Sequence, residues 1–183
     1  MSEKIVCGID PSLTSTGLAK ISGTEILNTD LIKTSGKQGV PYRERAERIS
    51  DIASQIAAFC IGADLIVIEG PSFRSVSTST WERAGLFYRC LEYFAGSATP
   101  FAVAPPKSAK KWASGSGAAS KEAVMDCLVN VFGSFTAPSF DVSDALALAG
   151  MGAHHLGDIA PKGKNRILAL KGVQWSQKTL NPA

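Results

Sequence analysis

Two acidic residues stand at the ends of two apolar runs of the sequence. Residues 5–10 read Ile-Val-Cys-Gly-Ile-Asp, and residues 64–70 read Asp-Leu-Ile-Val-Ile-Glu-Gly. Such runs predict strands that are covered on both faces. If the two strands are parallel neighbours, the carboxylates of Asp10 and Glu69 face each other across one strand spacing, roughly 5 Å. Like charges that close are costly unless a cation lies between them, so the pair predicts a divalent metal site, although Asp10 taken alone is also typical of a turn.

A second pair of acids could complete this site. Asp141 and Asp144 are three residues apart, so they share one face of the first turn of an apolar helix predicted over residues 141–155. A helix N-cap accounts for one acid but not for both. Four carboxylates match two divalent cations in charge, and ligands that are all oxygen select Mg²⁺ or Mn²⁺ over Zn²⁺. Two such ions can bind on either side of a scissile phosphate and promote its hydrolysis.

The elements that position these acids follow from hydrophobic periodicity and link length. Short links after the first strand predict antiparallel neighbours, and a helix before the second acid-bearing strand supplies the crossover that parallel pairing requires. The predicted class is therefore α/β with a mixed sheet. The other predicted elements are strands over residues 14–22, 25–33 and 100–104, and helices over residues 41–61, 81–95 and 120–132.

The loop after Glu69 contains an aromatic and a basic residue next to each other. Phe73 and Arg74 suit stacking on a base and contact with a phosphate. The alternative is that Phe73 folds back over the core as a small hydrophobic lid. Both interpretations stay open at the level of sequence.

Basic residues are concentrated in two parts of the chain, although the net charge is only +3. Residues 71–121 carry seven Lys and Arg against two Glu, and residues 157–183 carry five against one Asp. We therefore expect a polyanionic partner and a basic C-terminal tail over residues 157–183, which is either an arm on nucleic acid or a strand packed on a partner. The lysines expected beside the acids are Lys107, Lys110, Lys111 and Lys121.

The helix predicted over residues 81–95 is apolar on nearly all sides. One side can pack on the sheet, and the other predicts a subunit interface, with burial under another helix of the same chain as the alternative. At the end of the last helix, His154 and His155 are predicted to be surface residues rather than metal ligands.

The overall composition is that of a globular intracellular protein. The chain has 183 residues, of which 45% are hydrophobic and 19% charged. No apolar run approaches the ~20 residues of a membrane span, and no signal peptide opens the chain. None of the four cysteines has a partner at metal-ligand spacing. We therefore expect reduced thiols, no zinc site, no membrane association and a cytoplasmic location.

Three motifs in order resemble the RuvC family of Holliday junction resolvases. They are Gly-Ile-Asp-Pro-Ser, Val-Ile-Glu-Gly-Pro and Asp-Val-Ser-Asp-Ala-Leu-Ala-Leu-Ala, and the match covers roughly residues 4–156. The resemblance implies a ribonuclease H-like fold with a five-stranded mixed sheet of order 3-2-1-4-5. It also implies a nuclease domain over residues 1–156 and a homodimer, for which the helix over residues 81–95 supplies an interface.

The resemblance also implies an activity and a set of site residues. The activity is Mg²⁺-dependent (or Mn²⁺-dependent) cleavage of Holliday junctions and other branched DNA in recombination and repair, with two ions per site. Phe73 is similar to the aromatic residue that the family inserts near the junction centre, but it is displaced by one residue. The metal-binding acids implied are Asp10, Glu69, Asp141 and Asp144, with Lys107 and Lys121 as active-site lysines. Apart from the resemblance, the positions of Arg74, Lys110 and Lys111 after the strand ends predict contacts with DNA.

Parts of the sequence depart from the bacterial RuvC pattern. Pro105-Pro106 and the basic tail are more similar to a divergent or phage-encoded branch, and for a phage-encoded protein the expected location is the host cytoplasm. Two other functions remain in consideration. One is a junction-binding protein without catalysis. The other is an actin-like or sugar-kinase-like ATP-binding protein, because Asp-Pro-Ser-Leu-Thr-Ser-Thr-Gly resembles the first phosphate loop of that class; the chain has no second Gly-rich loop of this kind.

Overall fold

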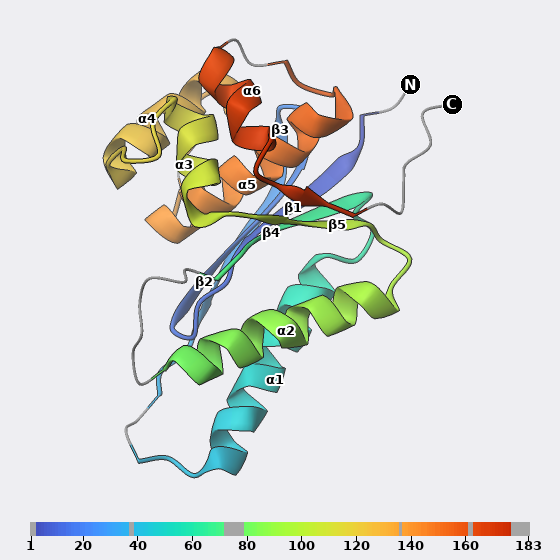
Figure 1. Cartoon of the computed structure of the whole chain (residues 1–183), viewed down its shortest axis with the longest axis vertical. Coiled ribbons are helices and arrows are strands. Elements are labelled where there is room, and N and C mark those ends of the chain that lie inside the picture. The colour runs from blue at the N-terminus through green and yellow to red at the C-terminus, as the bar shows by residue number, and fades with distance from the viewer. Residues whose placement is uncertain (1–2, 37–38, 72–78, 136, 161–162, 177–183) are drawn as a thin grey trace.

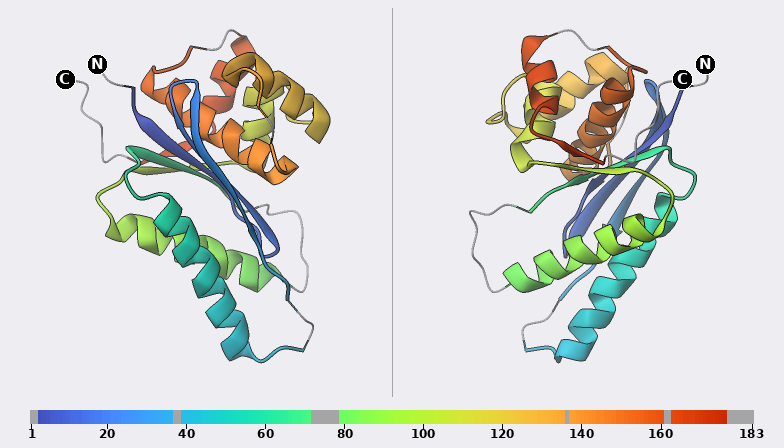
Figure 2. Two further views of the ribbon diagram at one scale, coloured as in Figure 1. Left: turned by 180° about the vertical axis from the view of Figure 1, so that it is seen from behind. Right: turned by 45° about the vertical axis from the view of Figure 1, so that its right-hand side comes forward.

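A computed structural model describes residues 3–36, 39–71, 79–135, 137–160 and 163–176. In it, one mixed sheet separates two groups of helices (Figure 1). Helices α1 (Tyr42–Phe59) and α2 (Thr80–Gly96) cover one face, and the other helices cover the opposite face, as both views of Figure 2 show. These others are α3 (Pro106–Ser114), α4 (Lys121–Phe132), α5 (Phe140–Leu156) and α6 (Lys164–Leu170).

The sheet has the predicted order with one strand added. Its strands are β1 (Ile5–Asp10), β2 (Ser15–Ser22), β3 (Glu25–Lys33), β4 (Leu65–Glu69), β5 (Phe101–Ala104) and β6 (Gln174–Trp175), in the order β3-β2-β1-β4-β5-β6. β1 to β3 form the antiparallel meander, and β4 runs parallel to β1 and to β5. The five-stranded order is confirmed. The sixth strand is an addition, because residues expected in the tail pair antiparallel with β5 at its outer edge.

Two hydrophobic cores lie on the two sides of the sheet. Successive residues of β1 alternate between them, because side chains of a strand point to opposite faces. Val6 packs in the core under α5, whereas Cys7 and Ile9 pack in the core under α1 and α2. Among the helices in the described residues, none has the length and apolar character needed to span a membrane.

Helix α5 lies unusually close to the sheet because glycines face it. A Cβ built on Gly8 would lie 2.0 Å from the carbonyl oxygen of Ala145, and one on Gly17 would lie 2.0 Å from that of Asp141. Real Cβ atoms do not come so close to backbone atoms, so only glycine fits at these positions. The backbone of α5 therefore rests directly on β1 and β2, and this close contact brings the first turn of α5 to the ends of the strands.

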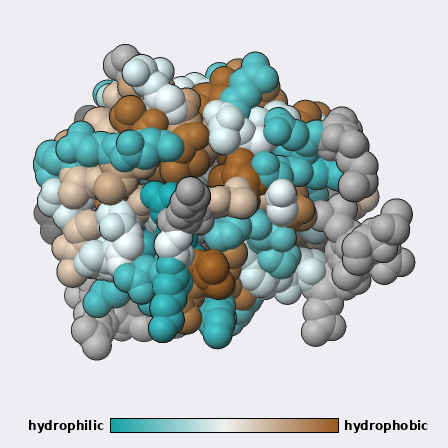
Figure 3. Space-filling model, turned by 90° about the horizontal axis from the view of Figure 1, so that it is seen from above, coloured by the Kyte–Doolittle hydropathy of each residue, from teal (hydrophilic) through white to brown (hydrophobic). Residues whose placement is uncertain are grey.

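Two segments contain helices that we did not predict. The residues between β5 and α4 contain α3, which begins with Pro106 and ends at Gly115 with φ +83°. Within residues 157–183, α6 packs on α3 and β6 on β5. Viewed from the end that carries α4 and α6, hydrophilic residues alternate with small groups of hydrophobic ones (Figure 3). This end therefore presents a mixed surface to solvent.

Candidate active site

The acids at the ends of β1 and β4 meet as the sequence predicts. The parallel register pairs Ile9 with Ile68, so Asp10 and Glu69 are the next residues on the two adjacent strands. Their carboxyl groups share a hydrogen bond. Two carboxylates cannot share a hydrogen bond unless one of them is protonated, so this pair binds a proton.

Burial makes the pair hold that proton strongly. Desolvation is the largest cause of both shifts, and it raises the pKa of Glu69 to about 9 and that of Asp10 to about 6. The negative charge of Asp10 raises the pKa of Glu69 further, whereas the shared hydrogen bond lowers that of Asp10. Glu69 is therefore the protonated partner and donates the hydrogen bond to Asp10 at neutral pH.

Asp141 reaches the same edge of the sheet from the first turn of α5. Gly17 is the cross-strand partner of Asp10, and the backbone of Asp141 lies directly against Gly17. The Ser15 hydroxyl donates a 2.5 Å hydrogen bond to the Asp141 carboxylate, and the Lys121 ammonium lies 3.9 Å from it. Asp141 is thus placed beside the pair with two partners already in contact.

Asp144, one turn further along α5, belongs to the same electrostatic cluster. Its charge raises the pKa of both Asp10 and Glu69. The pKa of Asp144 is itself raised, mainly by burial, while Lys110 and Lys121 act to lower it. Perturbed carboxyl groups that gather at one sheet edge with lysines nearby are typical of a functional site.

Among the lysines of α3, Lys110 is the one whose charge acts on the acids. It acts to lower the pKa of Glu69 and of Asp144, and its side chain is half-buried. Lys107 is exposed and packs beside Gly117, on the turn before α4. Helical phase explains the difference, because Lys107 and Lys110 are three residues apart and project about 60° from each other around α3. Lys111 is half-buried on α3, and Lys121 lies over the Phe140 ring at 5.6 Å.

The donor set fits divalent cations that prefer oxygen. The four acids supply only carboxylate oxygens, and the proton on the Asp10–Glu69 pair occupies a position where a cation can take its place. Within the described ranges, no three His, Cys, Asp or Glu side chains are arranged closely enough to hold one ion. A metal site built on the Asp10–Glu69 pair would need Asp141 or Asp144 to turn toward that pair.

Two other pairs of residues were considered in the sequence, the loop residues Phe73 and Arg74 and the two histidines. Phe73 and Arg74 lie outside the described residues. His154 and His155 lie at the far end of α5, as predicted, but neither is only a surface residue. The Trp112 indole donates a 3.1 Å hydrogen bond to Nδ1 of His154, and His155 stacks on Trp175 with ring centroids 3.7 Å apart.

Solved structures with the same architecture include two of RuvC from Thermus thermophilus. One is 22% identical to this chain, with a TM-score of 0.68 over 86% of this chain and 99% of RuvC. The other, in complex with a Holliday junction substrate, is 21% identical, with a TM-score of 0.68 over 94% of this chain and 99% of RuvC. No protein-family model and no curated protein sequence matches.

A resolvase from a eukaryotic organelle also resembles the chain. The yeast mitochondrial Holliday junction resolvase Ydc2 is 18% identical, with a TM-score of 0.57 over 84% of this chain and 79% of Ydc2. At these identities the likenesses establish the fold. The ribonuclease H-like fold implied by the sequence motifs is confirmed.

Proposed function

We propose that the protein is a structure-selective DNA endonuclease of the RuvC family that resolves Holliday junctions in recombination and repair. The observation that carries the proposal is the position of Asp10 and Glu69 at the ends of two adjacent parallel strands, with the first turn of α5, which carries Asp141 and Asp144, packed on the neighbouring strand beside them. The fold shared with RuvC supports the proposal, because that enzyme was solved with a Holliday junction substrate.

In this proposal the four acids hold two Mg²⁺ or Mn²⁺ ions. The ions, when bound, supply activation of the attacking water and stabilisation of charge on the leaving oxygen. Asp10, Glu69, Asp141 and Asp144 would hold the ions, the proton of the Asp10–Glu69 pair would pass to solvent, and the Asp141 carboxylate would no longer be paired with Lys121 alone. Lys121 is then free to contact a phosphate oxygen. Lys110 balances the negative charge that develops at the scissile phosphate.

Cleavage of branched DNA in a defined panel tests the function. Labelled four-way junctions, flaps and linear duplexes of the same sequence are incubated with the protein and Mg²⁺, with a chelator as the matched control. We expect paired nicks on opposite strands of the junction, little cleavage of linear duplex and none with chelator. Tight junction binding without cleavage under Mg²⁺ or Mn²⁺ would instead support the non-catalytic junction-binding protein.

Lys110 and Lys107 are expected to affect different steps. Lys110→Ala lowers the single-turnover cleavage rate about 10- to 100-fold, because it removes a charge beside the acids. Lys107→Ala, on the exposed side of the same helix, changes the cleavage rate little. It lowers the affinity for the junction, and it reduces the salt dependence of that affinity by the amount expected for about one phosphate contact. Rate constants at saturating enzyme and binding isotherms at two salt concentrations distinguish the two effects. Equal effects of both variants on the rate would contradict these roles.

We further propose that two copies act together through α2. Leu86, Phe87 and Cys90 are buried toward the sheet, whereas Trp81 and Tyr88 are 86% and 69% exposed. Residues seven apart lie on one face of a helix, so the two rings form an outward aromatic stripe that suits an isologous contact with a second copy. Two active sites related by two-fold symmetry match the symmetry of a four-way junction.

Replacing both exposed rings tests the dimer. Trp81→Glu with Tyr88→Glu is expected to convert a dimer to a folded monomer, measured by light scattering after size exclusion, with circular dichroism to check folding. Tyr42→Glu is the matched control, because Tyr42 is 85% exposed on α1. A wild-type protein that is monomeric at micromolar concentration would show that this interface does not form.

The proposed location is the cytoplasm. In the structure all the cysteines are free thiols, which fits a reducing compartment. They are Cys7, Cys60, Cys90 and Cys127.

A further inference from the structure

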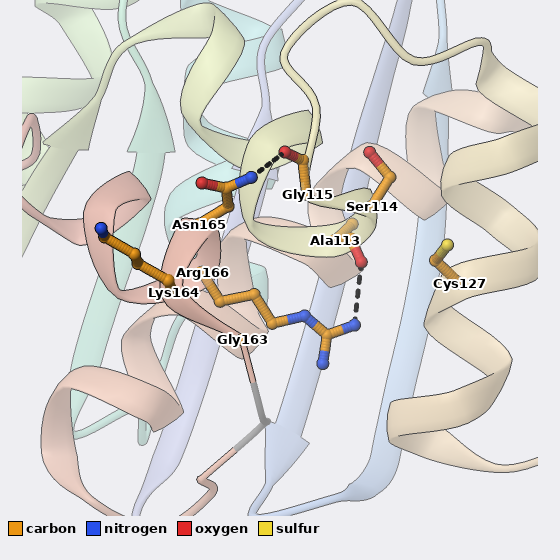
Figure 4. Close-up of a pocket in the computed structure, with 8 residues that line it drawn as sticks. All are labelled: Ala113, Ser114, Gly115, Cys127, Gly163, Lys164, Asn165 and Arg166. Carbon is orange, nitrogen blue, oxygen red and sulfur yellow. Dashed lines mark hydrogen bonds between the residues drawn. The ribbon is translucent and has the colours of Figure 1, made fainter.

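The C-terminal segment over residues 163–176 caps the helix that carries Lys110. Asn165 Nδ2 donates a 2.9 Å hydrogen bond to the Gly115 carbonyl, and Arg166 Nη2 donates one of 2.9 Å to the Ala113 carbonyl (Figure 4). The last carbonyls of a helix have no intrahelical donors. Side chains of α6 therefore satisfy acceptors at the end of α3 that would otherwise depend on water.

A tryptophan fixes α3 against the helix that carries Asp141 and Asp144. The buried Trp112 ring lies so close to α5 that a Cβ built on Gly150 would be 2.2 Å from it. Its indole N–H donates to His154, one turn after Gly150 on the same helix. The Arg166 guanidinium lies 5.7 Å from the centre of the same ring. Arg166 therefore contacts the last turn of α3 in two ways, through a hydrogen bond to its backbone and through the Trp112 ring.

The other end of the segment is attached to the strand that leads into α3. β6 pairs with β5 through Ala102 and Trp175, and β5 ends just before α3 begins. Trp175 also stacks on His155 with an interplanar angle of 6°, and its indole donates to the Leu170 carbonyl. The segment is therefore bound to β5 and to the end of α3, and the position of α3 depends on it.

We propose that Arg166 and Asn165 are positioning residues that hold Lys110 within reach of Glu69 and Asp144. The proposal rests on the nuclease function above and deepens it. Neither residue faces the acids, since both act at the last turn of α3, one turn beyond Lys110. The sequence left open whether the tail is an arm on nucleic acid or a packed strand, and over residues 163–176 it packs on α3 and β5.

A double-mutant cycle between Arg166 and Lys110 tests the inference. Arg166→Ala is expected to lower the single-turnover rate about tenfold with junction affinity unchanged, and to have no further effect in the Lys110→Ala background. Ile167→Ala is the matched control, because Ile167 is 55% exposed on the same helix. An equal fold-loss in both backgrounds would overturn the proposal, since it would show that Arg166 acts without Lys110.

Hydrogen exchange of the α3 amides tests the capping without any need for activity. Arg166→Ala and Asn165→Ala are expected to speed exchange at residues 110–115 while α4 stays as protected as in the wild type. Unchanged exchange in α3 would overturn the inference even if cleavage is seen. If the wild type cleaves no junction but the variants exchange α3 amides faster, as expected, the nuclease proposal is wrong and the capping of α3 by α6 is still supported. Asn165→Ala also serves where Arg166→Ala does not fold, because the Asn165 side chain is exposed.

Discussion

Replacing Glu69 by Gln is expected to abolish strand cleavage and, at the same time, to stabilise the metal-free protein at alkaline pH. The amide has the shape of the carboxyl and can donate the same hydrogen bond to Asp10, but it cannot become an anionic ligand. Loss of one of the four acids lowers the single-turnover rate by at least about a thousandfold, because charge on the scissile phosphate is then poorly compensated.

The gain in stability follows from the direction of the pKa shift. Burial and the nearby acids raise the pKa of Glu69 from an ordinary value of 4.5 to about 9. The folded wild type therefore binds more protons than the unfolded chain between these two values, so its stability falls as the pH rises from about 5 to about 9. The amide introduced by Glu69→Gln has no proton to lose, so the variant lacks this fall and is more stable by about 2 kcal/mol or more near pH 9.

Urea unfolding in chelator at pH 5, 7 and 9 measures this difference. The free energies of unfolding of the two proteins should agree at pH 5 and separate as the pH rises. Adding Mg²⁺ or Mn²⁺ at pH 8 should raise the wild-type melting temperature and leave that of Glu69→Gln nearly unchanged. Glu25→Gln, at an exposed position of β3, is the control for loss of a distant charge. A variant that is no more stable than the wild type at pH 9 would contradict the buried, protonated pair.

The acid pair could be predicted from sequence because its position depends on strands alone. An apolar run that ends in an acid locates the carboxylate at a strand end, and parallel pairing brings two such ends together. Asp141 and Asp144 follow from helical spacing and from the apolar helix behind them. The sequence pattern does not predict the contacts of the Asp141 carboxylate with the Ser15 hydroxyl and the Lys121 ammonium.

Helix α3 escaped prediction because its composition is typical of a loop. Two prolines and three lysines precede a Gly- and Ser-rich stretch, and only Ala109, Trp112 and Ala113 recur at helical spacing. Pro106 in the first turn and Gly115 at the end were the available signals. Without the helical phase, Lys107 and Lys110 could not be distinguished, so the lysine whose charge acts on the acids could be found only in the structure.

The C-terminal segment shows a second limit of sequence reasoning. α6 has seven residues and β6 has two, which are too few for a reliable periodic pattern. Their structure depends on partners far away in sequence, such as the carbonyls of α3 and the edge of β5. Composition left open whether the tail is an arm on nucleic acid or a strand packed on a partner, whereas tertiary contacts make residues 163–176 part of this chain's own fold.

Gly8→Ala is expected to cause a large loss of stability for the addition of a single methyl group. The new Cβ would lie 2.0 Å from the Ala145 oxygen and 2.5 Å from the Ala149 nitrogen, both backbone atoms of α5. Neither atom can move unless the whole helix moves away from β1. Overpacking between two rigid backbones should cost about 3 kcal/mol or more and lower the melting temperature by roughly 10 °C.

Movement of α5 away from β1 is expected to lower catalytic activity as well as stability. If α5 moves away from the sheet, Asp141 and Asp144 move with it, away from Asp10 and Glu69. The fraction of Gly8→Ala that folds at low temperature should therefore cleave junctions poorly and bind Mn²⁺ weakly. Gly96→Ala is the matched control, because a Cβ there meets nothing within 4 Å at the end of α2, and it should change stability by less than about 0.5 kcal/mol. A Gly8→Ala protein with wild-type stability would mean that α5 does not rest on β1 as closely as described, and the geometry of the four acids would need to be revised.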